Sequence, residues 1–179
     1  MKVHRTALDG VLLLEPAVHS DERGFFLEMY NEKAFTEAGI TERFVQDNLS
    51  NSKRGVLRGM HYQTENSQGK LIRVLDGEIY DVAVDLRCES KTFGNWAGVY
   101  LKAEEHRALW IPKGFAHGFY VLSEHAQVAY KVTSFYSPER ERTLLWNDPD
   151  LAIQWPLLGE PILSKKDRGG HFFREFRAR

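Results

Sequence analysis

The sequence has a single cysteine, Cys88, so it cannot form an intrachain disulfide, and a lone thiol is typical of a reducing compartment. It also lacks an excess of one charge, because 24 Lys and Arg balance 25 Asp and Glu, and no global field draws the chain to nucleic acid or an anionic membrane. Neither an apolar leader nor an apolar run long enough to span a bilayer is found. These absences predict a cytoplasmic protein that binds neither nucleic acid nor a membrane.

Low-complexity segments, internal repeats and linkers are missing too, which favours one domain over residues 1–179. Only residues 31–38, with Asn31 as the cap, predict a helix, and the Arg-rich tail at about 169–179 reads as a solvated terminus rather than a nucleic-acid arm. Short runs of β-branched and aromatic residues predict strands at 11–15, 25–30, 56–63, 70–75, 78–87, 96–102, 108–111, 119–122, 127–136 and 143–146. The fold class is therefore mainly β, a sandwich or barrel with short helices.

Alternation along two of these strands assigns side chains to faces. In residues 79–86, Asp81 and Asp85 share one face, so the other face should pack while theirs lines a cavity or meets water. On the last long strand, Tyr130 and Tyr136 share parity and should point into the same space.

Residues 111–117 have the P-x-G-x-x-H pattern of the second cupin motif, in which a Pro-Gly turn between strands directs a histidine, here His117, into a small β-barrel. A metal-dependent cupin normally supplies further ligands from a His-x-His motif. The corresponding stretch, residues 59–63, offers only His61. Two histidines fall short of the three or four ligands of a stable divalent site, so we predict a site without metal.

Arg58, His61 and Lys70 lie within two successive predicted strands. Strict alternation would place Arg58 and His61 on opposite faces, and both can line one pocket only if the strand bulges at Gly59.

Each of these candidates also has a structural interpretation. His61 could be a hydrogen-bonded strand residue, Lys70 an edge-strand lysine that discourages aggregation, Tyr130 a core aromatic, and Tyr136 an aromatic at a strand end. Residues 164–168 could be a solvated loop. Nothing local to any one of them decides between the two readings.

Taken together, the motifs resemble the dTDP-4-dehydrorhamnose 3,5-epimerases, cupin-fold enzymes of dTDP-L-rhamnose synthesis. The resemblance runs from about Leu8 to Arg168. It rests on residues 21–26, 44–48, 57–63, 68–74, 110–119, 130–138, 145–148 and 163–167. It implies a cupin-type jelly roll that converts dTDP-4-dehydro-6-deoxy-D-glucose to dTDP-4-dehydro-L-rhamnose without a cofactor.

The resemblance also implies roles for particular residues. His61 corresponds to the general base, Asp167 to the carboxylate that orients and charges it, Lys70 to the cation beside the C4 oxygen, and Tyr130 to the acid on the opposite face. Tyr136 would stack on thymine. The implied substrate-binding residues are Arg23, Glu28, Gln46, Asp47, Asn48, Arg58, His117, Tyr136, Glu141 and Lys166.

The implied assembly is a homodimer in which an N-terminal strand crosses to the partner and carries Arg23 and Glu28 with it. Two other functions remain open at this stage. One is a narrower epimerase that acts at C3 or C5 only or on a related dTDP-sugar, and the other is a cupin that binds a sugar without turning it over.

Overall fold

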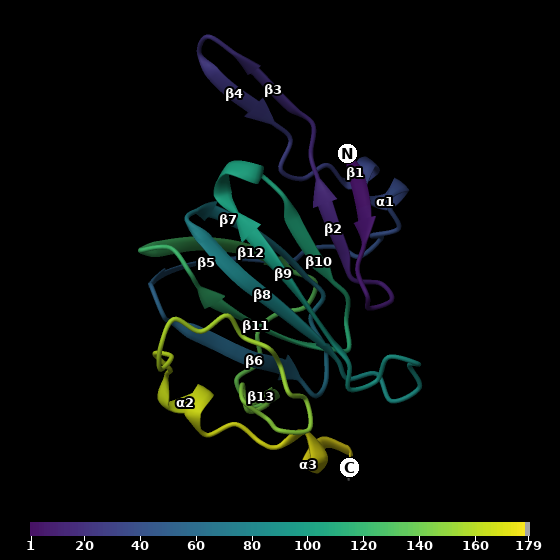
Figure 1. The fold of residues 1–179 in the computed structure, drawn as a ribbon. Helices are drawn as coiled ribbons and strands as arrows, with labels where there is room; N and C mark the ends of the chain where they lie inside the picture. The colour runs from purple at the N-terminus through teal and green to yellow at the C-terminus, as the bar shows by residue number, and fades with distance from the viewer. Residues whose placement is uncertain (178–179) are drawn as a thin grey trace.

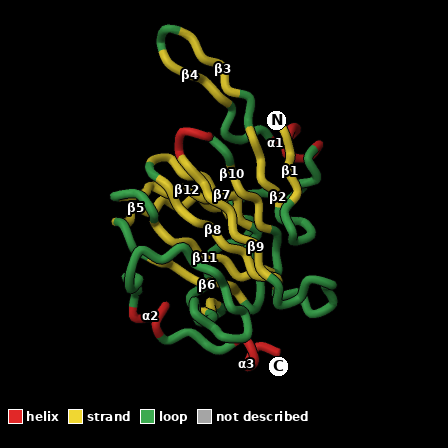
Figure 2. Tube along the Cα trace, viewed as in Figure 1, coloured by secondary structure: helices red, strands yellow, loops and turns green. Residues whose placement is uncertain are grey.

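The structure is a computed structural model that describes residues 1–177, and most of it is a sandwich of two antiparallel sheets (Figures 1 and 2). The six-stranded sheet has the order β1 (Lys2–Arg5), β2 (Leu12–Glu15), β10 (Ala108–Ile111), β7 (Lys70–Asp76), β12 (His125–Val132), β5 (Gln46–Lys53). The five-stranded sheet has the order β13 (Glu141–Thr143), β6 (Leu57–Gln63), β11 (Phe115–Val121), β8 (Glu78–Asp85), β9 (Trp96–Lys102). This arrangement confirms the mainly β prediction.

The main core lies between the two sheets. Ile72 on β7 and Val128 on β12 pack there against Ile79 on β8 and Phe119 on β11, all of them buried. Apolar side chains fill this layer toward one end of the strands, and removal of their surface from water stabilises the sandwich. The polar site described below occupies the remaining part of the same layer.

Two smaller apolar clusters cover the outer faces. On the six-stranded sheet, Phe35 of α1 (Glu32–Glu37) packs beside Trp110 and Leu71. The helix has the predicted cap, because the Asn31 side chain accepts a hydrogen bond from the backbone of Ala34. On the five-stranded sheet, apolar side chains of β6, β8 and β11 are covered by the C-terminal segment.

The antiparallel hairpin of β3 (Val18–Asp21) and β4 (Gly24–Leu27) projects from the body of the protein (Figure 1). All of its strand residues except Leu27 are exposed, among them Phe25, which is 61% exposed, and Phe26, which is 67% exposed. The remaining helical elements are short: η1 (Ala103–Glu105), α2 (Lys165–Arg168) and α3 (Phe173–Arg177). No helix within residues 1–177 is long and apolar enough to cross a membrane.

Several sequence predictions were wrong in detail. β12 ends at Val132, so Tyr136 follows the strand rather than belonging to it. Both faces of β8 are buried, including that of Asp81 and Asp85, so neither carboxylate meets water. Three strands, β1, β3 and β5, were not predicted because their residues are largely polar and form no apolar run.

The prediction of a solvated C-terminal tail was also wrong for the residues that the structure describes. Phe173 is only 5% exposed, and it joins an apolar cluster with Phe93 and Phe176. Residues 178–179 lie outside the described part of the chain.

Candidate active site

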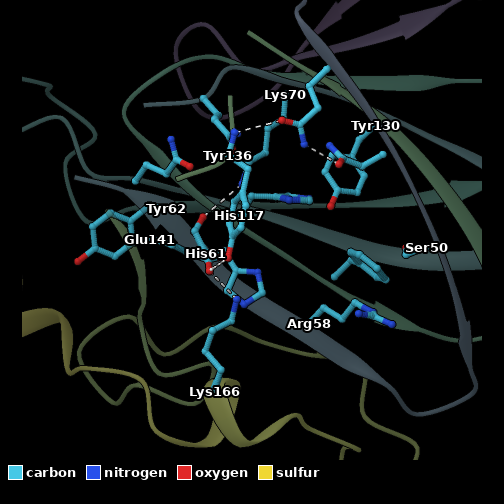
Figure 3. Close-up of a pocket in the computed structure, with 15 residues that line it drawn as sticks. Ser50, Arg58, His61, Tyr62, Lys70, His117, Tyr130, Tyr136, Glu141 and Lys166 are labelled. Atoms are coloured by element: carbon cyan, nitrogen blue, oxygen red, sulfur yellow. Dashed lines mark hydrogen bonds and ion pairs between the residues drawn. The ribbon is translucent and has the colours of Figure 1, made fainter. Parts of the chain in front are cut away.

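A polar cavity of about 340 Å³ opens between the sheets (Figure 3). It is lined by Gln46, Asn48, Ser50, Arg58, His61, Tyr62, Gln63, Gln68, Lys70, His117, Phe119, Tyr130, Tyr136, Glu141 and Lys166. Most of the side chains that the sequence singled out are therefore brought to one place.

The predicted bulge in β6 is present. Arg58 pairs with Phe119 and His61 with His117, so two residues of β6 lie opposite the single Gly118 of β11. Gly59 has a φ of +125°, and a Cβ there would lie 2.5 Å from the Gly118 Cα atom. Only glycine therefore fits at this position. The shift in register lets Arg58 and His61 line the same cavity.

His61 and Asp167 form a hydrogen-bonded pair at the cavity wall. His61 Nε2 lies 2.6 Å from Asp167 Oδ1, and the carboxylate is nearly inaccessible to solvent. The other carboxylate oxygen, Oδ2, accepts a hydrogen bond of 2.7 Å from the Ser164 hydroxyl. Since Nε2 is engaged, Nδ1 is the nitrogen that can exchange a proton with a bound molecule.

The two groups shift each other's pKa. Burial lowers the pKa of His61 below its ordinary value, while the hydrogen bond and the charge of Asp167 oppose that effect. Burial alone would raise the pKa of Asp167, but its hydrogen bonds with His61 and Ser164 outweigh burial and hold the pKa below its usual range. The pair is therefore set as a neutral imidazole beside a carboxylate, which is the form of a general base.

Lys70 and Tyr130 lie on the opposite sheet. They come from the neighbouring strands β7 and β12, where Lys70 pairs with Val132 and Tyr130 with Ile72, so both point inward. Burial lowers the pKa of Lys70 to about 8, against the pull of the Glu141 and Asp81 charges. Burial also raises the pKa of Tyr130 above its ordinary value. Near neutral pH, Lys70 is a cation and Tyr130 keeps its proton.

His117 is held from behind by a buried carboxylate. Its Nε2 lies 2.9 Å from each oxygen of Asp81, and Asp81 is fully buried on β8. The sequence had placed Asp81 on a polar face, but nothing in the strand pattern indicated that its partner would be His117.

Glu141 ties together three parts of the cavity wall. Its Oε2 accepts a hydrogen bond of 2.9 Å from the Tyr136 hydroxyl and pairs with Lys166 Nζ at 2.8 Å. Burial would raise the pKa of Glu141, but the bonds from Lys166 and Tyr136 outweigh burial and keep it lowered. An ionised Glu141 therefore joins the segment after β12 to α2, the helix that carries Asp167.

Strand β5 supplies a polar wall through every second residue. Gln46 and Asn48 line the cavity and are linked by a hydrogen bond of 2.8 Å. Asp47 lies between them and points to the other face, where it forms an ion pair with Lys131. Asp47 is thus not brought into the cavity of its own chain.

Arg23 and Glu28 also lie outside the cavity. Arg23 is at the tip of the projecting hairpin, where it bonds to Asp21, and Glu28 follows β4 and contacts Asn31. Within one chain, the structure therefore separates the two N-terminal candidates from the rest of the site.

Sequence reasoning missed several lining residues: Ser50, Tyr62, Gln63, Gln68 and Phe119. All of them except Ser50 belong to the quoted motifs, but their neighbours alone do not show which way they face. Ser50 continues the parity of Gln46 and Asn48, a signal that could have found it had β5 been predicted.

The described residues provide no ready metal centre. Among residues 1–177, no group of three His, Cys, Asp or Glu side chains is arranged to hold a metal ion.

Comparison with known proteins agrees with the geometry of the cavity. Residues 5–175 match the family described as dTDP-4-dehydrorhamnose 3,5-epimerase. The chain belongs to this family. The dTDP-4-dehydrorhamnose 3,5-epimerase of Pseudomonas aeruginosa is 57% identical over 176 residues, which cover 98% of this chain and 97% of that protein.

Solved structures of family members share the fold. The dTDP-6-deoxy-D-glucose-3,5-epimerase of Legionella pneumophila, in complex with dTDP-4-keto-L-rhamnose, superposes with a TM-score of 0.94 at 52% identity, covering 97% of this chain and 93% of that one. A 3'-monoepimerase of Streptomyces bikiniensis, in complex with dTDP-quinovose, has a TM-score of 0.91 at 34% identity, covering 98% and 89%. The predictions of a cupin-type fold and of an epimerase of dTDP-sugar biosynthesis are confirmed.

Proposed function

We propose that this epimerase inverts both C3 and C5 of dTDP-4-dehydro-6-deoxy-D-glucose, without a cofactor and through enolate intermediates, to give dTDP-4-dehydro-L-rhamnose. One observation carries the proposal. The His61–Asp167 pair belongs to the wall that includes β6, whereas Lys70 and Tyr130 come from the facing sheet. Figure 3 shows His61, Lys70 and Tyr130 around the cavity. A sugar ring between the sheets would have a base on one face and an acid on the other.

The reaction begins at a carbon next to the C4 ketone. His61 Nδ1 takes the proton from C5 or C3, the C–H electron pair forms a carbon–carbon double bond, and the carbonyl electron pair moves to oxygen. The C–H bond is acidic only because the enolate oxygen takes up the charge. A base with a pKa near or below neutrality is free to accept a proton at physiological pH, and the burial of His61 keeps it in that range.

The enolate oxygen needs a positive partner, and Lys70 supplies it. Its ammonium group is buried in the cavity wall, where a charge interacts more strongly than it does in water. Its Nζ lies 3.4 Å from the backbone oxygen of His61, so the cation reaches across to the strand that carries the base.

Inversion requires the new proton to reach the carbon from the opposite face. Tyr130 donates it from the facing sheet, and its raised pKa keeps the hydroxyl protonated until the enolate accepts the proton. The enolate double bond then reverts to the ketone. Exchange with solvent returns His61 and Tyr130 to their starting protonation states, after which the second carbon follows the same course.

The remaining site residues bind the substrate in this proposal. Arg58, His117 and Lys166 are the cationic or polar groups of the cavity that suit the sugar and diphosphate, with Tyr136 at the exposed end to stack on the base. Gln46, Asn48 and Glu141 fix the wall between them. Arg23, Glu28 and Asp47 bind substrate only if a partner subunit shares the site, and a homodimer that exchanges its N-terminal hairpin would provide this.

The experiment is incubation with the 4-keto sugar nucleotide in deuterium oxide, followed by mass spectrometry. Two deuterons in the product are expected, one at each inverted carbon. One deuteron would instead support a monoepimerase, a function that the related Streptomyces structure makes a specific alternative. No incorporation at all would mean that the cavity binds a sugar without turning it over.

A companion measurement addresses the cofactor. Exhaustive dialysis against a chelator should leave the exchange rate unchanged, because no step above uses a metal. Loss of exchange that zinc, manganese or iron restores would contradict the mechanism.

A further inference from the structure

Helix α2 carries Asp167 but is too short to hold it in place. It is four residues long, and isolated helices shorter than about 12 residues are marginal in water. Ser164 caps it by accepting a hydrogen bond from the Asp167 backbone and donating one to the carboxylate. These bonds orient Asp167 within the turn. The Lys166–Glu141 ion pair and a 3.4 Å contact from Gly59 N to Asp167 Oδ1 hold the turn from the side of the cavity, and its two flanks anchor its backbone.

The upstream flank is fastened to the start of β6. Ile162 forms a parallel bridge with Val56. The backbone of Ile162 donates to Gly55 O at 2.8 Å and accepts from Leu57 N at 3.0 Å. This anchor lies two residues before the cap of α2.

The downstream flank is fastened to the strand that pairs with the base. His171 forms a parallel bridge with Leu144, accepting from Leu145 N at 2.9 Å and donating to Thr143 O at 2.8 Å. Thr143 in turn is the register partner of His61 on β6. The chain that leaves Asp167 therefore returns within four residues to the backbone beside His61.

This second anchor is itself secured by α3. The backbone of Phe173 donates a hydrogen bond of 2.7 Å to Oδ2 of Asp148, a carboxylate that is almost completely buried. The Phe173 ring packs 5.3 Å from that of Phe93 and tightly against Gly94. The buried Phe173 ring therefore anchors this segment to the body of the protein.

We infer that residues 169–177 are a positioning element for the reaction, which holds Asp167 at hydrogen-bond distance from His61. The inference rests on the proposed function in that it takes His61 as the base. Small displacements at such pairs have large effects, since misplacement by about 1 Å can cost about 100-fold in rate.

Two adjacent glycines offer a matched pair of variants. A Cβ on Gly170 would lie 2.8 Å from the backbone C of Leu144 and from the backbone N of Leu145, so Gly170→Ala forces the segment away from the backbone that follows β13. A Cβ on Gly169 would meet its nearest neighbour, Lys165 O, at an ordinary 3.6 Å. Gly169→Ala is therefore the control for composition and for local chain stiffness.

Three readouts test the inference: kcat and KM in the exchange assay, the His61 pKa from proton NMR titration, and coupling to Asp167→Asn. Gly170→Ala should lower kcat roughly 10-fold or more with KM little changed. It should also move the His61 pKa downward, toward its value in Asp167→Asn, because the carboxylate that raises it has moved away. In the Asp167→Asn background it should have little further effect on kcat.

Gly170→Ala with the kcat and the His61 pKa of the unmodified protein would overturn the inference, and so would a loss of kcat that is additive with Asp167→Asn. If Gly170→Ala does not fold, Phe173→Ala replaces it, with Phe173→Leu as the conservative rescue and Phe172→Ala, outside the buried cluster, as the control. The NMR readout needs no turnover. An unmodified protein that exchanges no deuterium would therefore refute the proposed function while the positioning of Asp167 is still measured.

Discussion

Proton transfer at this site is governed by what surrounds each titratable side chain. His61 has a buried carboxylate behind it, whereas Lys70 is buried with no carboxylate within salt-bridge distance among the described residues and feels the charges of Glu141 and Asp81 only from farther away. The carboxylate favours protonation of His61 but does not outweigh burial, which lowers its pKa, and burial likewise lowers the pKa of Lys70. Base and cation can therefore be tested separately by their pH dependence.

The basic limb of the pH profile should report Lys70. Its pKa of about 8 predicts that kcat/KM, which reflects the free enzyme, falls as pH rises through about 8, because only the protonated amine stabilises the enolate. In Lys70→Arg the guanidinium stays charged at any accessible pH, so this limb should disappear although the maximal rate is lower. A limb near pH 8 that persists in Lys70→Arg would assign it to another group.

Substitutions of His61 and Tyr130 should affect deuterium exchange and product formation differently. His61→Asn should abolish deuterium exchange at both carbons, a loss of about 1000-fold or more, because the base starts the reaction. Tyr130→Phe should retain some exchange but form little inverted product, since the acid acts only after the enolate has formed. The measurement is exchange and product stereochemistry on the same samples. Equal and complete loss of exchange in both variants would show that Tyr130 acts earlier than proposed.

These residues also show what a sequence can establish about a site. Nothing local distinguishes Lys70 from an edge lysine or Tyr130 from a core aromatic, and it was the set of motifs taken together that predicted their roles. Asp81 remained unassigned because its partner, His117, lies on another strand, 36 positions along the chain. Pairings of this kind depend on strand register, which alternation within one strand does not specify.

At the scale of the element, the strands with a clear apolar face were the ones that the sequence predicted well. β7, β8 and β10 have faces buried against other strands and were predicted nearly to their ends. β5 was missed because its inward side chains line the cavity instead of a core, which leaves both of its faces largely polar. A strand that builds a binding site loses the pattern by which strands are recognised.

The turn that follows β8 is stabilised by the side chain of one residue, Asp85. Asp85, at the end of β8, accepts hydrogen bonds from the Ser90 and Thr92 hydroxyls and from the backbone and guanidinium of Arg87. Burial opposes ionisation of Asp85, but these bonds outweigh it and lower its pKa to about 2. The folded-state pKa is depressed, so the stabilisation is present above about pH 4 and is lost as pH falls toward 2.

Asp85→Asn should therefore lower the free energy of unfolding at pH 7 by about 2 kcal/mol, with a smaller difference between variant and parent near pH 2. Denaturant titration at both pH values measures it. Asp150→Asn, at an exposed position, is the control and should change little at either pH. A difference between Asp85→Asn and parent that is the same at pH 2 and pH 7 would mean that the charge of Asp85 does not stabilise the turn.

At the scale of the whole molecule, the projecting hairpin is the part that a single chain does not explain. It exposes two phenylalanines, and large exposed apolar surfaces mark sites of association. Its base is held firmly, because the buried guanidinium of Arg73 donates hydrogen bonds to the backbone oxygens of Met29 and His106. A hairpin that is anchored at its base and exposed to solvent at its tip is suited to contact a partner subunit.

Complementation between inactive chains tests whether that partner receives Arg23. Arg23→Ala and His61→Asn are each expected to be nearly inactive, and equal amounts are unfolded and refolded together. If the protein is the proposed homodimer, half of the dimers are then mixed. Each mixed dimer has one site with an intact Arg23 from one chain and an intact His61 from the other. Random pairing should restore about a quarter of the activity of the unmodified dimer.

The cavity supplies a matched control, because Lys70 and His61 line it in the same chain. A mixture of Lys70→Ala and His61→Asn gives mixed dimers in which each site lacks one of the two, so no activity should return. Recovery with Arg23→Ala but not with Lys70→Ala places Arg23 in the site of the partner and the cavity residues in their own. Absence of recovery in both mixtures, when the unmodified protein refolds to full activity, would mean that Arg23 does not complete the partner's site. Recovery in both would mean that Lys70 and His61 serve different sites, which the cavity of one chain contradicts.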